Sequence, residues 1–177
     1  MAVAYYFDCK PGHNGSLSRV GGQPTHLPIN KPWPDAEDYL YAFILQLEVD
    51  GTRIDLPDVA FLQFYQLADE GSDPTPCIVP VPGSAPVNTQ RKVVESPFVD
   101  QLDIAFIRKE DPDEMPDDLS LGTASLFKSK IGGVDPWVQL EDAEFLLQVT
   151  EDTGSNFGGT ACVVYRDLEN RLLVSMA

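Results

Sequence analysis

The chain has 177 residues, of which 43% are hydrophobic and 23% charged, a composition typical of a soluble globular protein. A chain of this length suits one domain that buries roughly 70% of its unfolded surface. The net charge of -16 repels phosphate and anionic lipid, which argues against direct nucleic-acid binding and favours a cationic partner. An acidic surface that serves only solubility is the alternative.

The cysteines and the apolar runs indicate where the protein works. Cys9, Cys77 and Cys162 are far apart and form no Cys-x-x-Cys pair, so we expect them to pack in the core of a protein from a reducing cytoplasm. The longest apolar runs, at 43–47 and 59–62, are too short to cross a bilayer. The first residues lack the pattern of a signal peptide. The sequence therefore predicts a cytoplasmic protein without membrane contact.

One stretch near the N-terminus recurs in the second half of the chain. Residues 18–22 are Ser-Arg-Val-Gly-Gly, and residues 129–133 are Ser-Lys-Ile-Gly-Gly. An apolar strand-like run with one glutamine follows each copy, with Gln46 in the first and Gln148 in the second. Two adjacent glycines accept positive φ and close backbone approach, so both pairs predict tight corners.

Period-two alternation, or a run of aromatic and β-branched residues, predicts the strands. We expect strands at 3–7, 39–49, 59–67, 102–106, 145–149, 160–165 and 171–176. The strands at 39–49 and 59–67 should form an antiparallel pair. Prolines restrict residues 77–79 to an edge strand or a loop. Residues 91–94 fit a short strand, and residues 120–127 fit either a strand or a short helix.

Prolines also define the segment between the first glycine pair and the strand at 39–49. Pro24, Pro28, Pro32 and Pro34 exclude helix interior and central strand, which predicts an extended segment from which Trp33 covers the core. Residues 35–38 follow the last of these prolines and fit one helical turn.

Residues 110–118 combine six carboxylates with two prolines, which predicts an exposed loop. The carboxylates are Glu110, Asp111, Asp113, Glu114, Asp117 and Asp118. Their spacing matches a calcium loop only in part, because Pro116 stands where such a loop needs glycine. We expect a solvated acidic loop and no metal site.

Many short strands, frequent prolines and little helical periodicity predict a mainly β fold with few short helices. The repeat suggests two pseudo-repeated antiparallel β units, at about 18–67 and 129–165, packed like a sandwich into a single domain over 1–177. Trp33 and Trp137 should cover related parts of the core. We expect the core to contain Phe43, Leu45, Phe61, Phe145, Leu147 and Val164.

The motif Gly21-Gly22-x-Pro24-x-x-x-Pro28-x-x-x-x-Trp33-Pro34, with Phe43-x-x-Gln46 after it and Lys130-Ile131-Gly132-Gly133 in the second half, resembles the bacterial YwqG-like family of unknown function. The resemblance covers roughly residues 18–165, although Val134-Asp135 intervenes before Pro136, where the family has an aromatic residue. YwqG-like domains are distantly similar to the programmed-cell-death-2 family, whose members are chaperones of a basic ribosomal protein. Bacterial members lie near polymorphic toxin systems. The resemblance implies an immunity or interaction role and no catalytic residues.

Residues with catalytic potential are few. His13 and His26 are the only histidines, and neither adjoins a nucleophile signature. The glycine pairs lack the spacing of a phosphate-binding loop, so structural turns are expected and no cofactor is. Gln46 and Gln148 need hydrogen-bond partners, which either the glycine corners or a paired ligand would supply.

The sequence thus favours a non-catalytic protein-binding module for a basic protein partner, such as a toxin or a ribosomal-type protein. The acidic loop would accelerate encounter, while Trp33 or Trp137 anchors the contact where it is exposed. The alternative is a hydrolase that uses acidic residues such as Asp135 with His26.

Overall fold

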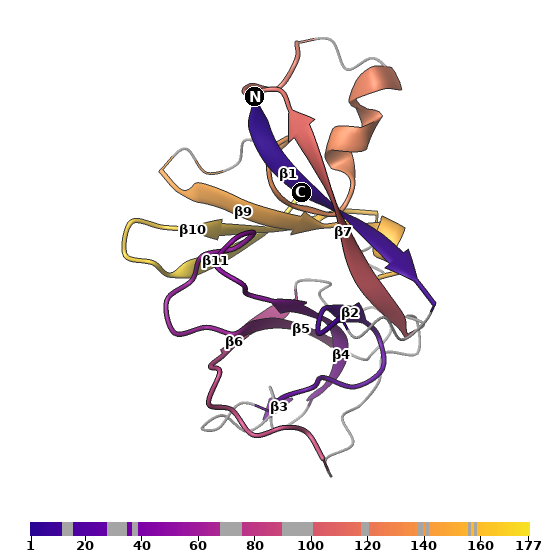
Figure 1. Cartoon of the computed structure of the whole chain (residues 1–177), viewed down its shortest axis with the longest axis vertical. Coiled ribbons are helices and arrows are strands. Elements are labelled where there is room, and N and C mark those ends of the chain that lie inside the picture. The colour runs from indigo at the N-terminus through magenta and orange to yellow at the C-terminus, as the bar shows by residue number, and fades with distance from the viewer. Residues whose placement is uncertain are drawn as a thin grey trace. The chain divides into compact units, whose positions relative to one another are not determined.

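The computed structural model describes residues 1–11, 16–27, 35–36, 39–67, 76–89, 101–117, 121–137, 140, 142–155, 157 and 159–177. Eleven strands and two short 3-10 helices form the regular structure of these residues, so the fold is mainly β, as predicted (Figure 1). Neither helix has the length and hydropathy that crossing a membrane requires. The chain divides into two compact units, residues 9–105 and residues 1–8 with 106–177.

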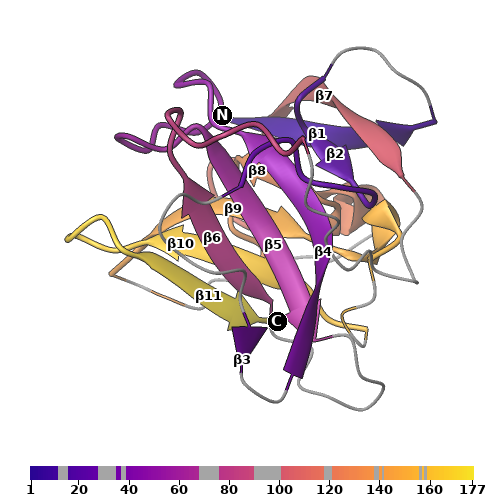
Figure 2. The same ribbon diagram turned by 90° about the horizontal axis from the view of Figure 1, so that it is seen from below.

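The 9–105 unit contains five short or medium strands and the start of a sixth. They are β2 (Arg19–Val20), β3 (Asp35–Ala36), β4 (Tyr39–Glu48), β5 (Phe61–Leu67), β6 (Cys77–Val81) and the first part of β7 (Leu102–Asp111). Hydrogen bonds connect them in the order β7-β2-β4-β5-β6, and β3 pairs with β4. Strands β4, β5 and β6 lie side by side in Figure 2.

The predicted pair of long strands is confirmed, and residues 77–79, expected as an edge strand or a loop, belong to an edge strand. β4 and β5 are antiparallel, with a bulge between Phe43 and Leu45, and among the described strands β6 pairs with β5 alone. The helical turn predicted at 35–38 is wrong for Asp35 and Ala36, which form β3 and pair antiparallel with β4, while residues 37 and 38 lie outside the described residues. Backbone pairing with β4 outweighs the local preference of these two residues for a helix start.

Both faces of β5 are buried, and one core cluster of this unit lies on a single face of the β4-β5-β6 strands. Phe43 and Tyr65 meet edge to face, with ring centroids 5.7 Å apart, and neither is exposed. Val79 and Val81 of β6 complete the buried cluster together with Phe61. The apolar residues therefore pack as the strand periodicity predicts.

The unit of residues 1–8 and 106–177 contains the other strands. They are β1 (Ala2–Lys10) up to Asp8, the rest of β7, β8 (Lys130–Gly132), β9 (Glu144–Val149), β10 (Cys162–Arg166) and β11 (Leu172–Met176). Their order is β11-β10-β9-β8-β1-β7. The 3-10 helices are η1 (Leu121–Phe127) and η2 (Glu151–Thr153). The ambiguous residues 120–127 thus form a short helix where they are described.

The core of this unit packs on β9 and β10. Leu147 and Val164 are fully buried, as predicted, whereas Phe145 is only half-buried. The Phe145 ring lies on the margin of a cluster centred on Tyr165, with ring centroids 6.1 Å apart. Trp137 packs against the same cluster, which places it over the core as expected. Trp33 and residues 91–94 lie outside the described residues.

Both glycine corners are tight turns with left-handed backbone. Gly21 and Gly22 have φ of 64° and 66°, and Gly132 and Gly133 have φ of 65° and 81°. Such values favour glycine, because a Cβ is strained there. The predicted corners at the ends of short strands are therefore present in both units.

The buried glutamines bond to the chain just before each corner. In the first unit Gln46 lies opposite Arg19, and its Nε2 donates to the Leu17 carbonyl at 2.7 Å. In the second, Gln148 lies opposite Lys130, and its Nε2 donates to the Lys128 carbonyl at 2.6 Å. These bonds fit the structural role expected for the amides. Superposition of the two repeats as whole units stays a prediction.

Candidate functional site

The acidic segment begins inside a strand, not in a loop. β7 extends to Asp111, so Glu110 and Asp111 belong to the sheet, and the prediction of a loop from residue 110 onward is wrong for these two positions. The Asp111 side chain is only 2% exposed. It is therefore a structural group and not a steering charge at the surface.

Three donors hold the Asp111 carboxylate. The Tyr6 hydroxyl donates to Oδ1 at 2.6 Å, and the Lys130 ammonium donates to Oδ2 at 2.6 Å. The backbone N–H of Val134 also donates to Oδ2 at 3.3 Å, while its carbonyl accepts from the ammonium at 2.8 Å. Both buried charges thus have a partner of opposite sign and an additional polar contact, as buried ions require.

The glycine corner makes this arrangement possible. A Cβ built on Gly133 would lie 2.7 Å from the Ala4 Cβ and 3.0 Å from the Asp111 Cγ, so no larger residue fits. The chain therefore passes directly over the carboxylate, and the sequence Lys130-Ile131-Gly132-Gly133 serves to bind Asp111. Lys130 and Tyr6 were not identified from the sequence as partners of Asp111. The position of Lys130 next to the apolar Ile131 in a strand was a signal that its charge could be buried and paired.

Burial dominates the electrostatics of the network. It lowers the pKa of Lys130, since the ammonium loses its hydration, while the nearby Asp111 carboxylate opposes that shift. Burial and the hydrogen bond to Asp111 raise the pKa of Tyr6, so its phenol stays protonated. A buried lysine with a lowered pKa resembles a catalytic group, but Lys130 is 0% exposed and both hydrogen bonds of its ammonium go to groups of the protein itself. The network therefore anchors the end of β7.

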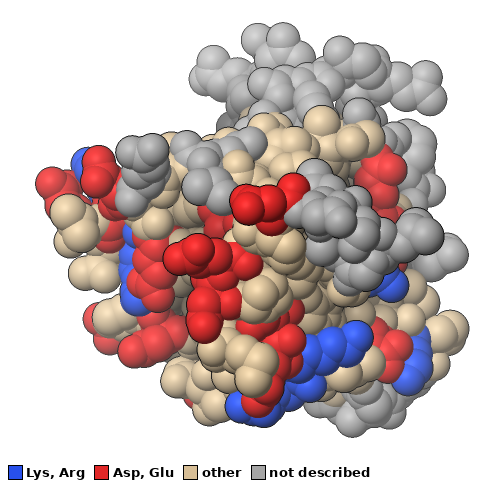
Figure 3. All heavy atoms as spheres, turned by 90° about the horizontal axis from the view of Figure 1, so that it is seen from above, with Lys and Arg blue, Asp and Glu red and all other residues tan. Residues whose placement is uncertain are grey.

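The remaining carboxylates of the segment are solvent-exposed where they are described. They are Glu110, Asp113, Glu114 and Asp117, and Asp118 lies outside the described residues. Asp113 is 74% exposed and forms an ion pair with the Met1 amine at 2.6 Å. Figure 3 shows a face on which Asp and Glu side chains are widespread, with Lys and Arg mainly toward its margins. The described part of the segment thus presents several exposed carboxylates. The segment starts at the end of β7, whose position the Asp111 contacts fix.

Trp137, the described one of the two predicted aromatic anchors, is half-buried. Its indole N–H donates to Gln148 Oε1 at 3.1 Å, and its ring meets Phe127 edge to face with centroids 5.1 Å apart. Its backbone N–H donates to Asp135 at 2.9 Å. These contacts fix the indole on the core and leave only part of it for a partner.

The residues of the hydrolase alternative are held in structural contacts. Asp135 accepts from the Trp137 N–H through Oδ1 and from the Tyr165 hydroxyl through Oδ2, the latter at 2.9 Å. His26 bonds to the Thr25 hydroxyl at 2.9 Å and stacks on Phe61 with ring centroids 4.6 Å apart. His13 lies outside the described residues.

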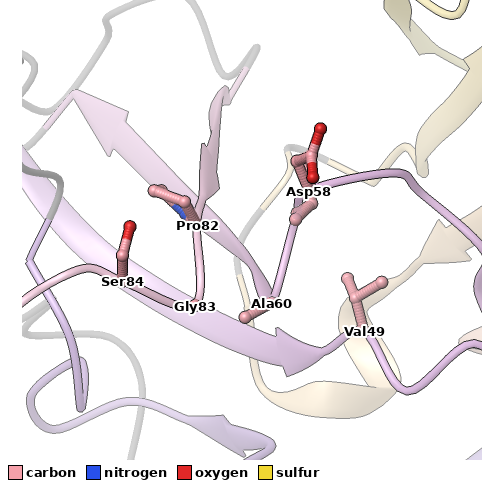
Figure 4. Close-up of a pocket in the computed structure, with 7 residues that line it drawn as sticks. Val49, Asp58, Ala60, Pro82, Gly83 and Ser84 are labelled. Atoms are coloured by element: carbon pink, nitrogen blue, oxygen red, sulfur yellow. The ribbon is translucent and has the colours of Figure 1, made fainter.

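A hollow of about 420 Å³ lies in the 9–105 unit, at the ends of β4, β5 and β6. It is lined by Val49, Asp58, Val59, Ala60, Pro82, Gly83 and Ser84. Figure 4 shows that the Asp58 carboxylate and the Ser84 hydroxyl stand apart on different segments. A lining with one carboxylate and no histidine does not form the nucleophile, base and orienting group that hydrolysis needs.

Neither a search for metal ligands nor a comparison with known proteins assigns a function to the site. Within the part of the chain that the structure describes, no three His, Cys, Asp or Glu side chains gather as a metal site. No protein-family model matches the chain, and no curated protein has a similar sequence. The resemblance to the YwqG-like family therefore stays a prediction.

Proposed function

We propose that the protein is a non-catalytic binding module that recognises a basic protein partner. The observation that carries the proposal is the group of exposed carboxylates that follows the buried end of β7, on a chain with net charge -16. Such a charge attracts a cationic protein over a distance of about one Debye length, roughly 10 Å at 0.1 M salt. The resemblance to the YwqG-like family suggests a toxin or a ribosomal-type protein as this partner.

The buried Asp111 supports the proposal, because it gives the acidic segment a fixed starting point while its exposed neighbours present the charge. The Asp111 carboxylate, bound by Lys130 and Tyr6, fixes where the segment leaves the sheet. The exposed neighbours Glu110 and Asp113 then start from a defined position. Fixed charges lose less conformational entropy on binding than charges on an unattached loop, which favours affinity as well as encounter. Part of the half-buried Trp137 provides an apolar contact in the same unit.

The test compares two triple variants of equal charge change. The first neutralises exposed carboxylates of the segment and leaves Asp111 intact, and it is Glu110→Gln, Glu114→Gln, Asp117→Asn. The control neutralises exposed carboxylates elsewhere, and it is Asp58→Asn, Asp142→Asn, Glu169→Gln. A partner is isolated from the native lysate, purified, and its association rate is measured by stopped flow at about 0.02 M and 0.5 M salt.

The segment variant should lower the association rate at low salt by roughly three- to tenfold, and the control should lower it less. At high salt the three proteins should associate at similar rates, because screening removes the long-range attraction. An equal effect of the two triple variants would remove the segment from the mechanism. A partner that is itself acidic would contradict the charge basis of the proposal. No observation among the described residues favours the hydrolase.

A further inference from the structure

The two glycine corners differ in the oxygen atom that lies against the second glycine. At Gly133 this atom is Oδ2 of Asp111, which also accepts from the Lys130 ammonium at 2.6 Å and the Val134 N–H at 3.3 Å. The space that the missing Cβ leaves is thus occupied by a carboxylate between a cation and a backbone amide. This corner shows that a carboxylate oxygen fits against the second glycine when a cation lies beside it.

At Gly22 the oxygen belongs to a neutral side chain. A Cβ on Gly22 would lie 2.7 Å from Oε1 of Gln101, the residue just before β7. Gln101 adjoins Leu102, which pairs with Val20 of β2, so its position beside the corner follows from the strand register. Its side chain is exposed to solvent, and it makes no hydrogen bond within the described part of the chain. Displacing this amide therefore breaks few interactions.

One donor of the cation at this corner has no acceptor among the described residues, unlike the ammonium at the other corner. Arg19 precedes Gly22 by three residues and lies opposite a buried glutamine, Gln46, as Lys130 precedes Gly133 and lies opposite Gln148. Arg19 Nε is buried, and no described residue accepts a hydrogen bond from it. Buried donors without an acceptor are rare and call for a specific explanation, such as a bound ion. Asp103 lies opposite Arg19 in the strand register, and it does not accept a hydrogen bond from Arg19 Nε.

We propose that Arg19 and the Gly21-Gly22 corner form a binding site for a carboxylate. The ligand carboxylate takes the place of the Gln101 amide oxygen and accepts hydrogen bonds from the Arg19 guanidinium, whose fork of donors matches two carboxylate oxygens. Glycine at position 22 leaves room for the oxygen, as Gly133 does for Asp111. Small organic acids and acidic side chains of peptides share this group. The site is independent of the basic partner proposed above.

Sodium acetate is the probe, and the reporter is the Arg19 Nε–H signal in ¹H–¹⁵N NMR spectra at 0.15 M NaCl. The signal is assigned by its loss in Arg19→Lys, and the Nε–H signal of exposed Arg108 serves as the reference. Acetate should shift the Arg19 signal along a saturating curve with a Kd of about 1–10 mM, and leave Arg108 nearly unchanged. A second titration with the amide of N-acetyl-aspartate shows whether a peptide side chain binds as a free acid does.

Variants of Gln101 separate the site from general attraction to cations. Gln101→Ala should strengthen acetate binding by about five- to tenfold, since the ligand no longer displaces an amide. Gln101→Glu should shift the Arg19 signal without any ligand and abolish acetate binding, because the new carboxylate fills the corner as Asp111 does. Arg19→Gln should abolish binding. Parallel linear shifts of Arg19 and Arg108, or unchanged acetate binding in Gln101→Glu, would overturn the proposal. Saturation by inorganic phosphate at lower concentration than acetate would overturn the carboxylate assignment.

Discussion

Replacing Asp111 with alanine should destabilise the protein far more than replacing any exposed carboxylate of the same segment. The substitution leaves the Lys130 ammonium, which is 0% exposed, without its counterion. It also removes the acceptor of the Tyr6 hydroxyl. Breaking a buried ion pair by removing one partner costs about 3–5 kcal/mol, because an uncompensated charge stays buried. That is a large fraction of the roughly 5–15 kcal/mol by which a folded domain is stable.

Urea unfolding monitored by tryptophan fluorescence gives the free energy of unfolding and its dependence on urea. Asp113→Ala is the matched control, since this carboxylate is 74% exposed, and its loss should change stability by about 0.5 kcal/mol or less. The double variant Asp111→Ala/Lys130→Met should recover much of the stability that Asp111→Ala loses, because neither buried charge remains. A loss below about 1 kcal/mol for Asp111→Ala would show that the buried pair does not anchor β7.

Further predictions concern single positions in the same unit. Gly133→Ala should lower the free energy of unfolding by more than about 2 kcal/mol, because φ at this position is 81° and the new Cβ would meet Ala4. Gly154→Ala is the control, since φ is 84° there but the space around it is open, and it should cost only about 1 kcal/mol in urea unfolding. Burial raises the pKa of the Cys162 thiol to about 12, so a variant that keeps only this cysteine should react with a disulfide reagent at pH 8 no faster than it unfolds. Phe145→Ala should cost about 1–3 kcal/mol, less than a fully buried phenylalanine, and a loss of 4 kcal/mol would show that the ring is more enclosed than described.

Strand positions were predictable because they depend on local alternation. The long strands β4 and β5 carry side chains that alternate in polarity or are apolar throughout, and neighbouring turn residues limit their ends. The strand β3 was not predictable in this way. Residues 35–38 have the composition of a helix start, and the pairing of Asp35 and Ala36 with β4 makes these two residues extended.

The burial of Asp111 could not be read from composition, because six carboxylates in nine residues indicate solvent exposure on average. Which of them is buried depends on where the chain brings a cation, and Lys130 lies 19 residues away in sequence. The degree of burial of Phe145 likewise depends on the position of Tyr165 and Trp137, which a strand pattern does not specify. Long-range partners thus account for both errors.

The two glycine corners share a backbone structure but differ in the side chain that lies over the second glycine. In each, a serine hydroxyl before the corner accepts a backbone N–H from the strand opposite, Glu48 N–H to Ser18 at 2.9 Å and Thr150 N–H to Ser129 at 2.8 Å. These bonds constrain the corner and its glutamine whatever lies over the second glycine. The atom over that glycine is then free to differ, and a change from carboxylate to amide alters the charge of the corner without altering its backbone. Asp111 accepts hydrogen bonds from the cation and the backbone of one corner, whereas at the other corner Gln101 lies over the glycine and no described residue accepts from Arg19 Nε.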